Sequence, residues 1–537
     1  MDLDLAALVW PGRNQPVLAS QGMVATSQPL AAGVGLDVLR DGGNAVDAAV
    51  ATAAALTVVE APTSSVGGDA FALIWDDQRL HGLNGSGRTP AGLTADVVRR
   101  HGHGAMPDRG WITVTVPGVP AAWRDLHTRF GKLPFERLIE PARDYAERGH
   151  PVSPISAWHW QWEVEEEHPK LDGDEIGGFM PLYAPDGHAP RVGELWRSQD
   201  MAASLGLIAE SRGDTVYTGE IAERIVGFAG ATGGLLAAED LASHASTWVE
   251  PISTGYRGFD VWEMPPNTQG IAALIALNIL EGFDVASLPR NSGESFHLQI
   301  EAMKLAFADT YQHVGDSDRR QIPTSELLAK DYAATRRQLV GDRASVAEPG
   351  TVPRGDTAYL CTADSDGMMV SYIQSSNSAF GSHIVIPGTG VVLQNRGAEF
   401  SLEPDHPNYL EPGKRSFHSI IPAFLTKDGN AVGPFGVMQG SMQPQGHLQM
   451  VVNTVDYRMD PQTSLDQPRW YWQRERRVLL EPTVESSIAE DLHRRGHSVS
   501  FWLERDAYGR GQIIWRLPTG SYVAGSDPRG DGQAAGF

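Results

Sequence analysis

Three side chains with hydroxyl or amide groups are predicted to meet where a linker ends and a sheet begins. Residues 341–355 hold several prolines and glycines and little periodicity, which is typical of a linker or surface loop. Thr357 opens the alternating strand that follows, and Ser375 and Asn377 come at the end of the next predicted strand. A hairpin places these regions side by side, so a second hydroxyl and an amide can reach Thr357. This is the composition of a nucleophile with supporting hydrogen bonds.

A strand that ends at a turn of small residues supplies a second feature. The turn within residues 436–441 includes Gln439 and Gly440. Such a turn can aim two successive N–H groups at one point, which is the geometry that stabilises an oxyanion. Both features also have an ordinary interpretation, because threonine has high β propensity and a glycine often only turns the chain. Residue types and spacing leave both interpretations open.

Other catalytic patterns are missing from the sequence. It contains no Gly-x-Ser-x-Gly elbow, no His-Glu-x-x-His and no complete Gly-x-Gly-x-x-Gly motif. Its 17 histidines lack the spacing of metal ligands. The lone cysteine, Cys361, excludes an intrachain disulfide and a zinc site built on several thiolates. We therefore expect neither a metal nor a cofactor.

The charge balance argues against polyanionic partners. The chain has 66 acidic and 43 basic residues, a net charge of −23, which repels nucleic acid and anionic lipid. The N-terminal segment 1–7 is acidic and lacks the basic and apolar regions of a signal peptide. No apolar run approaches the roughly 20 residues of a membrane span. Together with the single cysteine, these features favour a cytoplasmic protein.

Periodicity predicts clustered strands with helices beside them, which favours stacked sheets covered by helices. Helices are predicted at 29–39, 45–59, 120–130, 138–148, 201–211, 271–280, 295–310, 445–457 and 488–495. Strands are predicted at 22–26, 71–75, 81–84, 113–118, 256–264, 357–362, 368–374, 420–425 and 431–437.

Seven motifs in one order carry a family resemblance along almost the whole chain. They are GGNAVDAAVA at 42–51, VGGDAF at 66–71, VPG at 116–118, EMPPN at 263–267, EAMKLAFAD at 301–309, GSDPR at 525–529 and DGQAAG at 531–536. The chain resembles the γ-glutamyltranspeptidase family of N-terminal-nucleophile (Ntn) hydrolases. Residues 440–447, GSMQPQGH, resemble a divergent branch that includes oxamate amidohydrolases and cephalosporin-acylase-like members.

The resemblance implies an α+β fold, a four-layer αββα sandwich, made as one precursor and cut into two subunits. The cut matches the Asp356–Thr357 bond, giving a large subunit 1–356 and a small subunit 357–537. The Thr357 hydroxyl would be the nucleophile and its new α-amine the base, which needs no histidine. The resemblance leaves open whether the heterodimer forms a homo-oligomer.

Site residues carry over one by one. Ser375 would support the nucleophile, Asn377 would lie in the substrate site, and Gln439 and Gly440 would form the oxyanion hole. Glutamine replaces the first glycine of that pair, which restricts its φ. Arg88 matches the arginine that grips a substrate α-carboxylate, a bidentate role suited to a guanidinium.

Several positions in the substrate pocket depart from the γ-glutamyl enzymes. Glu399 replaces an aspartate, and His418-Ser419 replaces a serine pair. In segment 394–397, Arg396 replaces a glutamine and follows Asn395, a second candidate for substrate binding. The chain is also shorter between Phe400 and Arg415, which predicts a more open site. These features favour hydrolysis of an amide of a small carboxylate-bearing substrate. A true γ-glutamyltransferase or glutathione hydrolase is the first alternative, and an unprocessed ligand-binding pseudoenzyme is the second.

Overall fold

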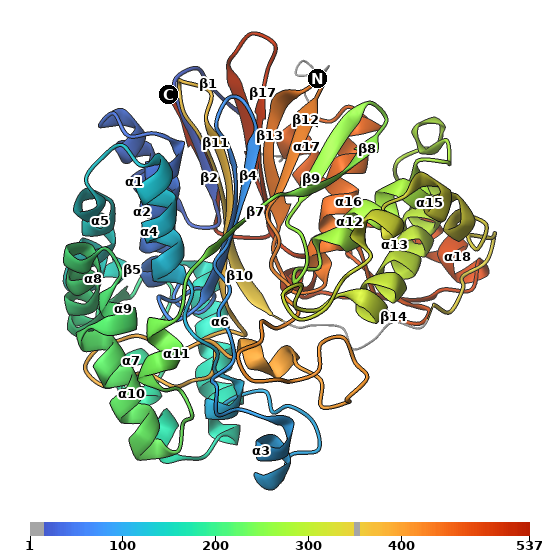
Figure 1. Ribbon diagram of the computed structural model, residues 1–537. Coiled ribbons are helices and arrows are strands. Elements are labelled where there is room, and N and C mark those ends of the chain that lie inside the picture. The colour runs from blue at the N-terminus through green and yellow to red at the C-terminus, as the bar shows by residue number, and fades with distance from the viewer. Residues whose placement is uncertain (1–14, 348–354) are drawn as a thin grey trace.

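Two seven-stranded, largely antiparallel sheets form the centre of the structure, a computed structural model that describes residues 15–347 and 355–537 (Figure 1). The first sheet has the order β19 (Gln533–Gly536), β2 (Met23–Thr26), β10 (Asp356–Ala363), β11 (Met369–Asn377), β3 (Asp69–Trp75), β4 (Leu80–Asn84), β7 (Thr247–Val249). The second has the order β1 (Val17–Ala19), β18 (Tyr522–Ser526), β17 (Gly511–Arg516), β13 (Asn430–Val437), β12 (Ala423–Lys427), β9 (Phe259–Glu263), β8 (Ile252–Tyr256).

Helices cover the outer face of each sheet, so the molecule has the four layers αββα that the sequence predicts (Figure 1). Over the first sheet lie α1 (Pro29–Arg40), α2 (Ala45–Val59), α4 (Val119–Phe130), α5 (Phe135–Arg148) and α8 (Gln199–Ser211). Over the second lie α12 (Gly270–Leu280), α13 (Gly293–His313), α15 (Lys330–Arg337), α16 (Met442–Val455), α17 (Pro461–Asp466) and α18 (Ser486–Arg494). None of the helices within the described ranges is long and apolar enough to cross a bilayer.

Apolar side chains fill three separate layers of the sandwich. One core lies between the first sheet and its helices, and another lies between the second sheet and its helices. The third lies between the sheets and includes Phe71, Tyr359, Cys361 and Phe424. Alternation along β10 explains this division, because Ala358 and Leu360 contribute to the helix side while Tyr359 and Cys361 face the other sheet.

Strands from both sides of the predicted cut are interleaved in each sheet. In the first sheet, β10 and β11 lie between β2 and β3, and in the second, β12 pairs with β9. Cutting the chain before Thr357 would therefore leave two subunits joined by continuous backbone hydrogen bonds.

Two predicted strands differ from the structure. Residues 113–118 contain the end of a 3₁₀ turn, Trp111–Thr113, and then extended chain outside both sheets, where Val116 donates to the carbonyl of Arg88. The predicted strand 256–264 is instead the end of β8, a turn at Arg257-Gly258, and β9. Of the predicted linker 341–355, residues 348–354 lie outside the described residues, as does the acidic segment 1–7.

Candidate active site

The predicted catalytic residues lie at one edge of the sandwich because neighbouring strands are antiparallel. β10 begins beside the end of β11, which lies beside the start of β3. Asp356 faces Asn377, and Ser375 faces Asp69 across these pairs. A side chain at Gly68 would place its Cβ 2.5 Å from the carbonyl oxygen of Ser375, so glycine permits this approach.

Thr357 lies at an irregularity in the sheet, with a polarised carbonyl next to it. The β10–β11 register shifts between Asp356 and Ala358. The Ser375 hydroxyl donates a hydrogen bond to the Asp356 carbonyl oxygen, and the N–H of Asn377 donates to Ser375 Oγ at 2.8 Å. Thr357 is 1% exposed, and its Oγ1 has no hydrogen-bond partner among the described residues. An uncommitted hydroxyl thus adjoins the carbonyl that it would have to attack.

The turn after β13 has the backbone conformation that glycine favours. Gln439 has φ of +100° and Gly440 has φ of +44°. Gln269 holds this turn, because its Nε2 donates to the carbonyl of Gly440 at 2.8 Å and also to that of Ser419. A glutamine with positive φ is strained, and such strain often occurs at active sites.

Arg396 and Glu399 lie three residues apart on one 3₁₀ turn, Arg396–Glu399, so their side chains are neighbours. The Arg396 guanidinium is 1% exposed and donates from Nη1 to Ser419 Oγ at 2.8 Å. Burial raises the pKa of Glu399 to about 7, although the Arg396 charge and a hydrogen bond with the Asn377 side chain oppose the rise. Asn377 connects this turn to the bond predicted to be cut. Its side chain contacts Glu399, and its backbone pairs with Asp356 across the sheet.

His418 pairs with Asp69 close to the Arg396 guanidinium. His418 Nε2 lies 3.0 Å from Asp69 Oδ2, and both side chains are buried. Burial and the nearby Arg396 charge lower the pKa of His418 to about 4, so the ring is neutral near pH 7. Burial alone would raise the pKa of Asp69, but the hydrogen bond and charge of His418 and the charge of Arg396 lower it overall. Asp69 therefore remains an acceptor.

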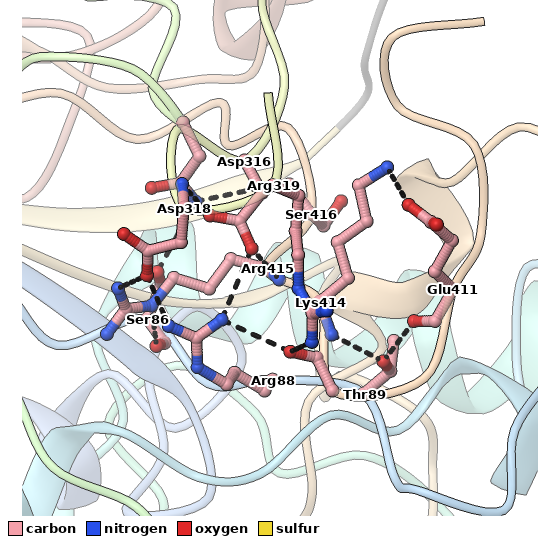
Figure 2. A network of polar contacts seen from close by, with 12 residues as sticks. Ser86, Arg88, Thr89, Asp316, Asp318, Arg319, Glu411, Lys414, Arg415 and Ser416 are labelled. Carbon is pink, nitrogen blue, oxygen red and sulfur yellow. Dashed lines mark hydrogen bonds and ion pairs between the residues drawn. The ribbon is translucent and has the colours of Figure 1, made fainter. Parts of the chain in front are cut away.

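Two other predicted substrate residues point to protein partners. Figure 2 shows Arg88 in a network with Asp316, Asp318 and Arg415. Arg88 Nη1 lies 3.2 Å from Asp316 Oδ2, and its Nη2 lies 2.5 Å from Asp318 Oδ2. Asn395 donates from Nδ2 to the Asp108 carbonyl at 2.7 Å and accepts from the Ser378 N–H at 3.0 Å.

Sequence reasoning gave no role to three residues of this region. Asp69 was present only as part of the VGGDAF motif, and Gln269 follows the EMPPN motif without belonging to it. Tyr311 of α13 is buried, its Oη lacks a hydrogen-bond partner among the described residues, and burial with the nearby Tyr471 and Glu399 raises its pKa. No local pattern distinguishes such a tyrosine from a core residue.

One cluster in the described part of the chain has ligand types suited to a metal ion, His297, Glu301 and His497. Lys304 Nζ already lies 2.6 Å from Glu301 Oε1, and Ser345 Oγ donates to the other carboxylate oxygen at 2.5 Å. These internal contacts explain the cluster structurally, because they hold residues 341–345 against helix α13.

Comparison with known proteins identifies the family. The Gamma-glutamyltranspeptidase family matches residues 31–537. The chain belongs to the γ-glutamyltranspeptidase family. Members are Ntn hydrolases and the chain is accordingly an enzyme of this type, which confirms the resemblance read from its motifs.

Relatives of the γ-glutamyltranspeptidase family cover the chain almost completely. The crystal structure of a cephalosporin acylase from Bacillus halodurans is 49% identical, with a TM-score of 0.95, and the match covers 100% of this chain and 99% of that one. A "Glutathione hydrolase-like YwrD proenzyme" of Bacillus subtilis is 36% identical over 98% of this chain and 100% of its own length. An "Oxamate amidohydrolase proenzyme" of Klebsiella pneumoniae is 32% identical over 97% and 99%.

These relatives confirm the divergent branch and the four-layer fold expected from the sequence. Their proenzyme names agree with a precursor processed into two subunits. The family is shown to be one of self-processing amide-cleaving hydrolases, with a glutathione hydrolase activity also represented by name among the relatives.

Proposed function

We propose that this chain cuts itself at the Asp356–Thr357 bond and then hydrolyses an amide of a small carboxylate-bearing substrate through an ester with Thr357. The observation that carries the proposal is the contact between Ser375 and the Asp356 carbonyl, beside the uncommitted Thr357 hydroxyl. The products of the cut are residues 1–356 and 357–537.

Self-cleavage uses groups that are already adjacent. The Thr357 hydroxyl adds to the carbonyl carbon of Asp356, which Ser375 polarises by hydrogen bonding. The C–N bond then breaks, which leaves an ester between Asp356 and the Thr357 oxygen and frees the Thr357 α-amine. Water hydrolyses the ester and releases the Asp356 carboxylate and the threonine hydroxyl.

Turnover of substrate repeats the same chemistry with the freed amine as base. An unperturbed α-amine has a pKa of about 7.7–8.0, so a useful fraction accepts a proton near neutral pH. The amine takes the hydroxyl proton as Thr357 Oγ1 attacks the amide carbonyl, and the N–H groups of Gln439 and Gly440 face the developing oxyanion. The substrate's amine leaves with a proton, and water then hydrolyses the acyl ester.

The side chains around Arg396 indicate which acyl group the enzyme accepts. Arg396, Glu399, His418 and Ser419 lie close to one another, and three of them differ from the γ-glutamyl pattern. We infer a small anionic acyl group, as the name of the oxamate amidohydrolase relative also suggests. The second candidate is a γ-glutamyl group, which the name of the glutathione hydrolase-like relative favours.

A denaturing gel with N-terminal sequencing tests the cut. Wild type should give a small fragment of 181 residues (537 − 356) that begins Thr-Ala-Tyr-Leu, while Thr357→Ala stays one chain. The cut enzyme is then assayed for release of amine and acid from a γ-glutamyl anilide, oxamate and a glutaryl amide. An uncut wild type that turns over no amide would support a ligand-binding pseudoenzyme instead.

A further inference from the structure

The guanidinium of Arg396 has one edge without a hydrogen-bond partner among the residues that the structure describes. Its Nη1 is bonded to Ser419, but Nε and Nη2 are buried and make no hydrogen bond with the described residues. These two nitrogens form the side of a guanidinium that can bind both oxygens of one carboxylate in parallel. A buried charged side chain with two donors that lack partners among the described residues indicates a site for an anion.

The acidic neighbours of Arg396 do not fill this edge. Asp69 already accepts from the N–H of Gly87 at 2.8 Å, from Gln394 Nε2 at 2.9 Å and from His418 Nε2 at 3.0 Å. Glu399 is in contact with the Asn377 side chain. Both acids lie close enough to influence the Arg396 charge, yet neither bonds to Nε or Nη2.

Hydrogen bonds connect Arg396, through its Nη1 and through its neighbour Asn395, to residues of the catalytic site on two sides. On one side, Ser419 and Gly440 are held together by the same Gln269 amide. On the other side, Asn377 donates to the Asn395 carbonyl at 3.3 Å, next to Arg396 in the chain, and faces Asp356 across the sheet. Arg396 is therefore linked by short chains of contacts both to the turn at Gly440 and to Asp356, the residue before Thr357.

Arg88, the position that a carboxylate clamp would occupy by resemblance, has both of its Nη atoms bonded to the protein. Its two Nη atoms contact Asp316, Asp318 and the Gly413 carbonyl (Figure 2). Asp316 Oδ2 also accepts the N–H of Arg415 at 2.9 Å. A substrate carboxylate at Arg88 would have to compete with two aspartates, and the existing contacts hold residues 413–415 against residues 316–318.

We propose that the Nε–Nη2 edge of Arg396 binds a terminal carboxylate of the acyl group and thereby selects the substrate, while Arg88 holds the 413–415 segment in place. The proposal rests on the proposed function and names the side chain that sets its acyl specificity. An ammonium beside that carboxylate, as in a γ-glutamyl group, would be repelled by the guanidinium unless an ionised acid faced it.

Matched anilides test the proposal in the cut enzyme. Glutaryl, γ-glutamyl and pentanoyl p-nitroanilides have five-carbon acyl chains and differ in carboxylate and ammonium. Wild type should prefer glutaryl by at least about 10-fold in kcat/KM over the other two. Arg396→Gln should lose about 100-fold on glutaryl, mainly through KM, and stay within about 3-fold on pentanoyl. Arg396→Lys should recover part of the loss, since it keeps the charge without the fork.

Arg88→Gln is the matched control, and it should preserve the ratio of glutaryl to pentanoyl turnover. Equal turnover of glutaryl and pentanoyl substrates by wild type would overturn the Arg396 proposal and leave the proposed function standing. Loss of the glutaryl preference in Arg88→Gln rather than Arg396→Gln would return the clamp to Arg88.

Binding to the uncut variant Thr357→Ala separates this proposal from failure of the enzyme activity. Millimolar glutarate should raise the Tm of Thr357→Ala by a few degrees, and pentanoate should not. Adding Arg396→Gln should abolish the shift, while adding Arg88→Gln should leave it. An equal shift in the presence and absence of Arg396 would overturn the proposal whether or not the enzyme turns over any amide.

Discussion

The hydroxyl of Ser375 donates a hydrogen bond to the carbonyl oxygen of Asp356, one residue before the predicted nucleophile. The N–H of Asn377 donates to the same hydroxyl oxygen at 2.8 Å, so the hydroxyl proton is directed to the carbonyl. In the uncut chain, Ser375 is therefore placed as a donor to the oxyanion that self-cleavage forms. After the cut, the same hydroxyl lies beside the new N-terminus.

Replacing Ser375 by alanine should slow self-cleavage. Removing one donor to a developing oxyanion costs about 100- to 1000-fold in rate, and the loss here should fall near the lower limit because the carbonyl is already bound in the ground state. The measurement is the appearance of the fragment that begins at Thr357, followed on gels from purified precursor. Ser375→Thr keeps the hydroxyl and should be cut at close to the wild-type rate. Cleavage of Ser375→Ala at the wild-type rate would show that this contact does not assist the reaction.

The glutamine in the oxyanion turn should cost stability without supplying catalysis. Gln439 has φ of +100°, a conformation that costs a non-glycine residue about 1–3 kcal/mol. Gln439→Gly should therefore raise the free energy of unfolding by about 1 kcal/mol and leave kcat within a few-fold, since the backbone N–H remains. Gly440→Ala, at φ of +44°, should change stability in the opposite direction. Urea unfolding of both variants in the uncut Thr357→Ala background checks the signs.

Glu399 should make substrate binding depend on pH near neutrality. Because burial raises its pKa to about 7, the side chain is neutral below pH 7 and becomes anionic above it. The new negative charge lies beside Arg396, so KM for a carboxylate-bearing substrate should rise as the pH passes upward through 7. Glu399→Gln should give a KM that is flat across this range. A wild-type KM that falls with rising pH would contradict the assignment.

The raised pKa of Glu399 should also make the stability of the folded chain depend on pH. A carboxyl group whose pKa is higher in the folded chain binds more protons there than in the unfolded chain. The free energy of unfolding should therefore fall as the pH rises from the ordinary glutamate value toward 7, and Glu399→Gln should remove that part of the slope.

The layers of the fold were predictable because the strands and helices with strong patterns are those of the sandwich. The hairpin of residues 357–362 and 368–374 occurs as β10 and β11, and segment 45–59, which is mostly alanine, valine and leucine, is helix α2, buried along its length. Residues 113–118 were wrongly predicted as a strand because their Thr and Val residues suit one. In the structure, Gly87 has no side chain, which allows the backbone of this segment to pack against the loop that contains Gly87. A Cβ at Gly87 would lie 1.7 Å from the Val116 carbonyl oxygen.

The sequence predicts which backbone segments form the site better than it predicts the partners of the side chains. Thr357, Ser375 and Asn377 lie together because they belong to one hairpin, β10 and β11. Whether a guanidinium is free or paired depends on residues distant in sequence, and the Arg88 contacts with Asp316 and Asp318 span more than 220 positions. No local pattern reveals that Arg88 has partners while one edge of Arg396 has none within residues 15–347 and 355–537.

Among the buried carboxylates near Arg396, Asp69 should be the one whose substitution lowers the free energy of unfolding most. Its two oxygens accept three hydrogen bonds, from Gly87 N–H, Gln394 Nε2 and His418 Nε2. In Asp69→Asn, an NH₂ group replaces one acceptor and faces a donor, which leaves buried groups unsatisfied at about 1–3 kcal/mol each. We expect the free energy of unfolding of uncut Thr357→Ala to fall by about 2–4 kcal/mol. Asp77→Asn is the matched control, because Asp77 is 61% exposed and lies 3.6 Å from Arg516, and it should shift stability by less than about 0.5 kcal/mol. Equal effects of the two substitutions in urea unfolding would show that the Asp69 cluster does not stabilise this edge of the sandwich.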